Sequence, residues 1–136
     1  MPLKKVLVVV DDNLVCWALR KELANHRLNA FIAGSGMECL SAVRENRFDL
    51  VFLDIHLPDR NGLEALEDIH ATNPDLPVVI LTMSAEPEYV EDAVRKGAAG
   101  YLVKNAPQSE LIRAVRAAAA GDAYIQAEVT RPLLAR

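Results

Sequence analysis

Residues 50–53 read Leu-Val-Phe-Leu, and the acid Asp54 follows them directly. An uninterrupted apolar run of this length is typical of a β-strand that is buried on both faces. Residues 6–10 read Val-Leu-Val-Val-Val, have the same character, and are followed by Asp11 and Asp12. Two such strands, each followed by carboxylates, indicate the centre of a parallel sheet.

Apolar stretches of strand length alternate with segments of helical periodicity on either side of these two runs. Further strands are predicted at 28–33, 78–81 and 101–103. Helices are predicted at about 14–25 behind an Asn13 N-cap, 37–43, 63–73, 86–96 and 108–120. Parallel strands need crossover connections, and these crossovers are right-handed. The predicted fold is therefore α/β, a doubly wound, open five-stranded parallel sheet with helices on both faces.

Length and composition fit one domain and exclude several classes of protein. The 136 residues are 51% hydrophobic and 25% charged, with a net charge of −4, which argues against nucleic-acid binding by this chain itself. No apolar stretch approaches the roughly 20 residues that span a bilayer, and the apolar run after Lys4 and Lys5 is too short for a secretion signal. Cys16 and Cys39 are too few for a disulfide framework or a zinc site, so we expect reduced, packed thiols in a cytoplasmic protein.

Chemically active side chains follow four of the five predicted strands. The first strand is followed by Asp11 and Asp12, the third by Asp54, the fourth by Thr82 and the fifth by Lys104. In a doubly wound sheet, the binding crevice lies outside the carboxyl ends of the strands. We therefore expect these side chains to meet at one edge of the sheet.

This combination of groups favours metal-assisted phosphoryl chemistry. Clustered carboxylates attract a divalent cation, and all-oxygen ligands suit a hard ion such as Mg²⁺. One carboxylate could act as a nucleophile and form an acyl-phosphate, while Lys104 neutralises one phosphoryl oxygen and Thr82 donates a hydrogen bond to another. Each residue alone has a plainer interpretation as a helix cap, a turn residue or a solvated side chain. Their joint placement after apolar strands favours the functional interpretation.

At these positions the sequence resembles the receiver domain of two-component response regulators. The resemblance covers residues 5–121 and rests on the motifs Val9-Val10-Asp11-Asp12, Leu53-Asp54-Ile55-His56-Leu57-Pro58, Gly62, Leu81-Thr82 and Tyr101-Leu102-Val103-Lys104. In this order and spacing the motifs are highly specific. The resemblance implies a flavodoxin-like (βα)5 fold with strand order 2-1-3-4-5.

The resemblance also implies roles for the residues at the acidic end of the site. Asp54 matches the phosphoacceptor, and the phosphoryl donor would be a histidine kinase or a phosphotransfer protein. Asp12 and Asp54 match direct Mg²⁺ ligands, with Mn²⁺ as a substitute, and Asp11 matches the acid that acts through a water. The backbone carbonyl of His56 matches the remaining protein ligand. The chain would modify itself, so we do not expect it to be an enzyme.

A second group of residues matches the switch of the family. Thr82 and Lys104 match the phosphoryl-sensing pair. Tyr101 matches the aromatic residue that turns inward when Thr82 moves toward the phosphoryl group. Residues 82–105, around the fourth helix and the fifth strand, would carry the signal.

Three positions match those that tune the lifetime of the phosphoryl group in similar proteins: His56, Met83 and Ser84. Met83 stands where a small residue is common in the family, and it would narrow access to the phosphoryl group. The His56 imidazole would position a water near the aspartyl phosphate. The alternative is a solvent-facing histidine with no such role.

Other features resemble receivers that precede a LuxR/NarL-type helix-turn-helix in transcription regulators. They are Gly97-Ala98-Ala99-Gly100-Tyr101, Asn105 after the lysine, and Gly121-Asp122-Ala123-Tyr124-Ile125. We expect a receiver domain at 1–121 and the start of a linker at 122–136. A missing C-terminal domain would then bind DNA. The sequence leaves open whether the receiver forms a homodimer.

Three alternatives remain. A flavodoxin-like module that binds FMN would use the same crevice, but Asp11 and Asp12 would repel its phosphate. A metal-dependent phosphatase would place its nucleophile after the first strand and a second acid two residues later, where Asn13 stands. A receiver that acts as an interaction scaffold without phosphorylation is the third, and the complete set of acids, threonine and lysine argues against it.

Overall fold

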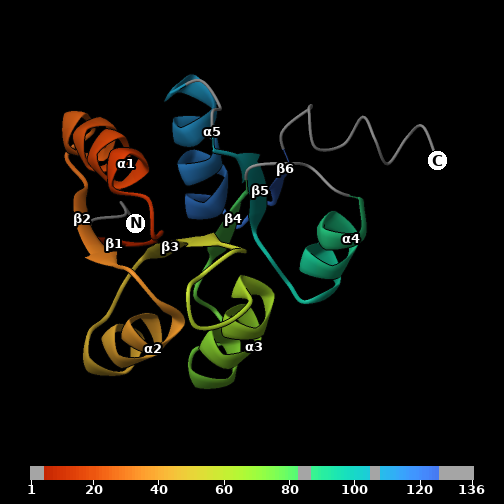
Figure 1. Cartoon of the computed structure of the whole chain (residues 1–136). Coiled ribbons are helices and arrows are strands. Elements are labelled where there is room, and N and C mark those ends of the chain that lie inside the picture. Colours follow the sequence, from red (N-terminus) through yellow and green to blue (C-terminus); the bar gives the residue numbers. More distant parts are fainter. Residues whose placement is uncertain (1–4, 83–86, 105–107, 126–136) are drawn as a thin grey trace.

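Six parallel strands and five helices make up the described part of the chain (Figure 1). The structure is a computed structural model that describes residues 5–82, 87–104 and 108–125. The strands are β1 (Lys5–Val9), β2 (Asn29–Ala33), β3 (Leu50–Asp54), β4 (Val78–Thr82), β5 (Gly100–Val103) and β6 (Tyr124–Ile125). The helices are α1 (Asn13–Asn25), α2 (Gly36–Glu45), α3 (Gly62–Thr72), α4 (Pro87–Arg95) and α5 (Gln108–Ala119).

The sheet has the order β2-β1-β3-β4-β5-β6, and every neighbouring pair is parallel. The predicted α/β fold and the order of its first five strands are confirmed. Because all strands run in one direction, their carboxyl ends share one edge of the sheet, which we call the carboxyl edge.

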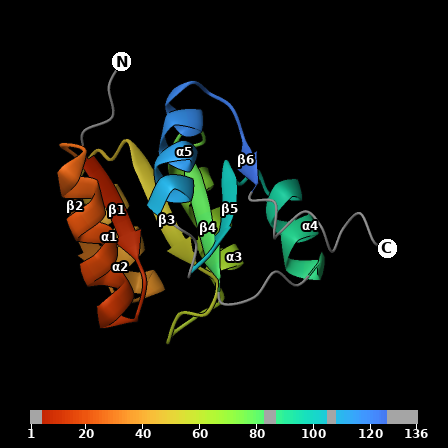
Figure 2. The ribbon, with the colours of Figure 1, turned by 90° about the horizontal axis from the view of Figure 1, so that it is seen from above.

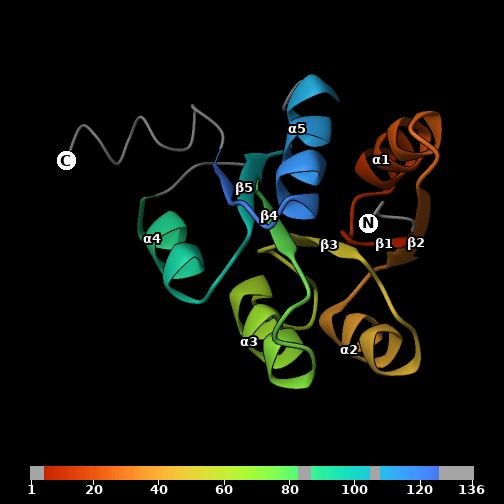
Figure 3. The same ribbon diagram turned by 180° about the vertical axis from the view of Figure 1, so that it is seen from behind.

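Helices cover both faces of the sheet. Figures 1 and 3 show α1 and α5 on one face, and α2, α3 and α4 on the other. Figure 2 looks onto the first face, where α1 lies over β1 and β2. Within the described ranges, none of the helices is long and apolar enough to cross a membrane.

Alternate side chains of the strands enter two separate cores. In β1, Leu7 and Val9 pack with residues of α2, α3 and α4, whereas Val6 and Val8 pack with residues of α1 and α5. β3 and β4 are buried along their whole length. Burial on both faces explains why both sequences are apolar up to their last residues, Asp54 and Thr82, which lie at the carboxyl edge.

The sixth strand corrects the predicted number of five. β6 pairs in parallel with β5, and the Tyr124 amide donates to the Ala99 carbonyl at 2.8 Å. The Tyr124 hydroxyl donates a hydrogen bond to Glu110 of α5. A Cβ on Gly100 would lie 2.8 Å from the Tyr124 carbonyl oxygen, so the glycine permits this close approach. A two-residue strand is too short to show a period in the sequence.

The N-cap of α1 also differs from the prediction. The helix begins at Asn13, and the cap is Asp12, whose Oδ1 accepts from the amides of Leu14 and Val15 at 2.9 and 3.2 Å. An aspartate is favoured here because its negative charge faces the positive end of the helix dipole. The prediction of Asn13 as the cap is wrong by one residue.

The loop between β3 and α3 is tied to the start of α2 by Asp59. Its Oδ1 accepts from the Gly36 amide at 2.8 Å, and its Oδ2 accepts from the Met37 amide at 3.0 Å. The hydrogen bond from the Gly36 amide, and after it the one from Met37, hold the pKa of Asp59 below its usual value. The loop that follows Asp54 is therefore fixed to α2 by a charged acceptor.

Asp59→Asn should lower the free energy of unfolding near neutral pH and have no effect in strong acid. A carboxyl whose pKa is depressed by folding stabilises the fold above its unfolded pKa of about 4, and this contribution is lost as the pH falls through the lower folded-state value. Urea unfolding of both proteins between about pH 7 and about pH 2 measures the difference. The matched control is Asp75→Asn, at an exposed acid that precedes β4. A difference that stays constant with pH would contradict the prediction.

Candidate functional site

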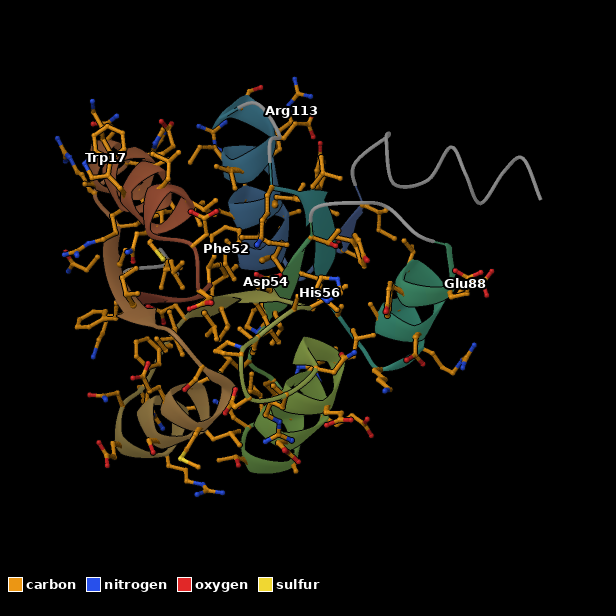
Figure 4. All side chains as sticks on the ribbon, viewed as in Figure 1. Trp17, Phe52, Asp54, His56, Glu88 and Arg113 are labelled. Atoms are coloured by element: carbon orange, nitrogen blue, oxygen red, sulfur yellow. The ribbon has the colours of Figure 1, made fainter. Side chains whose placement is uncertain are left out.

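Asp54 ends β3, an inner strand of the sheet, and its carboxylate is buried (Figure 4). The residue is 1% exposed, and Nζ of Lys104 lies 2.6 Å from its Oδ2. Lys104 follows β5, two strands away, and its side chain is only 11% exposed. A buried ion needs a partner, because its desolvation costs several kcal/mol. The two residues form a buried ion pair at the carboxyl edge.

Backbone hydrogen bonds hold the second oxygen of Asp54 and place the lysine. The His56 amide donates to Oδ1 of Asp54 at 3.1 Å. Thr82 ends β4, is 1% exposed, and accepts a hydrogen bond at its carbonyl from the Lys104 amide at 2.7 Å. Because β4 lies between β3 and β5, Thr82 stands between the ends that carry the acid and the lysine. The fold thus brings Asp54, Thr82 and Lys104 together.

Asp11 and Asp12 follow β1, on the other side of β3, and both are exposed. Cys16, in the first turn of α1, is buried, and its Sγ donates to the Val10 carbonyl at 3.3 Å. Burial raises the pKa of Cys16, the charge of Asp12 raises it further, and the charge of Lys104 lowers it. Asp12 and Lys104 therefore act on the same thiol from the ends of β1 and β5, which agrees with their places at the carboxyl edge.

The acids suit a hard cation by their chemistry, and in this structure two of them have other partners. Asp11, Asp12 and Asp54 offer only oxygen atoms, which Mg²⁺ prefers. Oδ1 of Asp12 caps α1, and Oδ2 of Asp54 faces the Lys104 ammonium. Within the described part of the chain, no group of three or more His, Cys, Asp or Glu side chains is placed to hold a metal ion. The arrangement present is that of an ion pair.

The two ring side chains singled out by the sequence lie in different environments. Tyr101 is 1% exposed and packs in the core on the side of α2, α3 and α4. The His56 ring is exposed, and it meets the ring of Tyr89 on α4 edge to face, with 6.0 Å between the ring centroids. Met83 and Ser84 lie outside the described residues.

Two residues near the site were not singled out by the sequence analysis. Tyr89 is one aromatic residue in an amphipathic helix, and nothing in its neighbourhood distinguishes it from a core residue. Asp59 lies in the turn Pro58-Asp59-Arg60-Asn61. Only that composition hints at a role, because Asp and Asn side chains readily accept hydrogen bonds from helix amides.

Gly62 lets the start of α3 lie directly against the end of β3. Its amide donates to the Ile55 carbonyl at 2.6 Å. A Cβ at this position would lie 2.0 Å from the carbonyl oxygen of Asp54 and 2.8 Å from Cα of Ile55. Any larger residue must therefore displace the main chain beside the buried acid.

Gly62→Ala should lower the free energy of unfolding by about 1–3 kcal/mol, the usual cost of an overpacked site. The clash is with main-chain atoms, which cannot rotate away as a flexible side chain would. The matched control is Gly34→Ala, where a Cβ would meet only Oε2 of Glu38 at an ordinary 3.5 Å. Chemical denaturation compares the variants. Equal stability of Gly62→Ala and the parent protein would contradict the prediction.

Lys104→Met should lower the free energy of unfolding by about 3 kcal/mol, because it leaves the Asp54 carboxylate buried without its partner. In an Asp54→Asn background the same substitution should cost much less, since no buried charge remains. Denaturation of the four proteins gives the coupling energy. As a control, Lys96→Met removes a more exposed lysine that pairs with Glu67 at 2.9 Å, and should cost about 1 kcal/mol or less. Equal losses in both backgrounds would rule out the coupling.

Comparisons with known proteins point to one family. Residues 6–116 match the family described as response regulator receiver domain. Response regulator GacA of Pseudomonas aeruginosa is 34% identical over 131 residues, which cover 95% of this chain and 61% of that protein. Oxygen regulatory protein NreC of Staphylococcus epidermidis is 33% identical over 132 residues, which cover 94% of this chain and 61% of that protein. The chain thus spans about three fifths of the length of these relatives.

A solved structure extends the similarity to three dimensions. The crystal structure of a LuxR-family two-component response regulator from Aurantimonas sp. SI85-9A1 superposes with a TM-score of 0.89 and 25% sequence identity. The match covers 98% of this chain and 97% of that one. The matched family spans both the strand that ends in Asp54 and the residue Lys104 that pairs with it. The chain therefore belongs to the response regulator receiver domain family and is a receiver domain of a two-component response regulator.

Proposed function

We propose that this receiver accepts a phosphoryl group on Asp54 from the phosphohistidine of a histidine kinase or phosphotransfer protein. The observation that supports this most is the ion pair between Asp54 and Lys104 at the carboxyl edge. A carboxylate held at a strand end beside an ammonium has a nucleophilic oxygen and, next to it, a charge that can stabilise a phosphoryl oxygen. The chain would then be a signalling domain that modifies itself, acting in the cytoplasm.

The transfer step follows from these groups. An oxygen of Asp54 forms a bond to phosphorus, the bond between phosphorus and the donor imidazole nitrogen breaks, and the imidazole leaves with the electron pair. The Lys104 ammonium exchanges its contact with the carboxylate for one with a phosphoryl oxygen, and the Thr82 hydroxyl donates a hydrogen bond to another phosphoryl oxygen. Positioning and charge neutralisation supply most of the catalysis.

Asp11, Asp12, Asp54 and the backbone carbonyl of His56 are the groups we propose to hold Mg²⁺, or Mn²⁺ in its place. Their oxygen atoms match the preference of hard cations. A divalent ion held there would offset the repulsion between the carboxylates and the incoming phosphoryl oxygens. Divalent-ion dependence of the reaction is part of the proposal.

The proposed output is a change in the surface around α4 and β5. The Lys104 amide donates a hydrogen bond to the Thr82 carbonyl, where Thr82 ends β4 and Lys104 directly follows the neighbouring strand β5, so movement of one residue affects the other. Tyr101 of β5 is buried in the same core as Val90 and Ala93 of α4, and its inward position fits a switch between two alternative packings. In the whole protein, a helix-turn-helix domain that binds DNA is the output domain we propose, with the receiver at 1–121 and a linker from 122.

The test is the intact mass of the chain after incubation with acetyl phosphate and Mg²⁺. One phosphoryl adduct should form on the parent protein and on Asp75→Asn, and none should form on Asp54→Asn or without a divalent ion. No adduct on the parent protein would overturn the phosphoacceptor proposal. If the affinity for a partner protein does not change when a phosphoryl analogue is added, this would instead favour an interaction scaffold that is independent of phosphorylation.

A further inference from the structure

The contact between His56 and Tyr89 joins the phosphoacceptor loop to α4. The two rings are perpendicular, with an interplanar angle of 90° and 6.0 Å between their centroids. This is the edge-to-face arrangement that aromatic pairs prefer. Figure 4 shows His56 on the side of Asp54 that faces α4. The contact therefore connects α4 to the loop that begins at the buried acid.

Both partners of this contact are anchored at their backbones. The His56 amide donates to Oδ1 of Asp54, and His56 forms an isolated bridge with Asn61, the N-cap of α3. Tyr89 is half-buried and packs against the core, and the next residue in α4, Val90, is completely buried. The backbones of His56 and Tyr89 are thus held in place. The contact between their rings favours one orientation of the His56 imidazole, which is otherwise exposed.

We infer that Tyr89 is a positioning residue that holds the His56 ring as a wall beside Asp54 and so lengthens the life of the phosphoryl group. This inference rests on the proposed function. In hydrolysis, a water oxygen bonds to phosphorus, the bond from phosphorus to the Asp54 oxygen breaks, and inorganic phosphate and the carboxylate are released. In this inference the His56 ring, which Tyr89 holds toward α4, restricts the approach of that water from the α4 side instead of positioning it. Displacement of α4 would open the wall, so the position of α4 and the phosphoryl lifetime are coupled.

The lifetime is measured by loading the chain with acetyl phosphate and Mg²⁺, removing the donor, and following the adduct by intact mass. Tyr89→Ala and His56→Ala should each raise the rate of loss by about two- to tenfold, the scale of one aromatic pair. The double variant should lose the group no faster than the faster single variant. Tyr89→Phe keeps the ring and should match the parent protein. Val94→Ala, at an exposed residue of α4, is the matched control.

A second readout does not depend on phosphorylation. The ring protons of His56, assigned with His56→Ala, should show a ring-current shift in NMR spectra that disappears in Tyr89→Ala and persists in Tyr89→Phe. An unaltered spectrum in Tyr89→Ala would overturn the contact itself. A normal adduct with an unchanged or longer lifetime in Tyr89→Ala would overturn the inference while leaving the phosphoacceptor proposal intact. Failure of the parent protein to form any adduct would overturn both.

Discussion

The ion pair between Asp54 and Lys104 sets the geometry of the carboxyl edge. A carboxylate that is 1% exposed is stable as an ion only if a positive charge and hydrogen-bond donors reach it. The ammonium comes from the end of β5 and the donor from the His56 amide, so β3, β4, β5 and the loop after β3 must keep a fixed register. The same oxygen atoms are the ones that we propose to take a phosphoryl group. Both the stability of the carboxyl edge and its proposed chemistry thus depend on the charges of Asp54 and Lys104.

Helix starts add a second constraint at this edge, because each helix of a βα unit begins where its strand ends. Asp12 caps α1, Ser35 caps α2 and Asn61 caps α3, all through side-chain oxygens. Asp59 adds a further carboxylate at the start of α2. The positive ends of these helix dipoles favour anions. The amides at the starts of these helices therefore favour negative charge at the carboxyl edge, as the Lys104 ammonium does.

This arrangement also argues against the two alternative functions, a metal-dependent phosphatase and a module that binds FMN. In a phosphatase with an aspartyl nucleophile, that nucleophile follows the first strand. Here the acids that follow β1 are Asp11 and Asp12, which are exposed, and Asp12 caps α1. The acid that is buried and paired with a cation follows β3 instead. The same two exposed acids would repel the phosphate of a bound FMN. Burial and pairing, more than residue type, distinguish Asp54 from the other carboxylates.

Local pattern determined the class of sheet, the sequence of elements and the residues at the strand ends, because a strand buried on both faces must be apolar and must stop where polar residues begin. Contacts between distant segments were decided only by the tertiary structure. The amide hydrogen bonds of Asp59 to α2, the pairing of Tyr124 beside Gly100, and the edge-to-face contact of His56 with Tyr89 join residues with no shared periodicity. Their formation depends on how closely packed elements approach one another, to within a few tenths of an ångström, and no local sequence rule sets that distance.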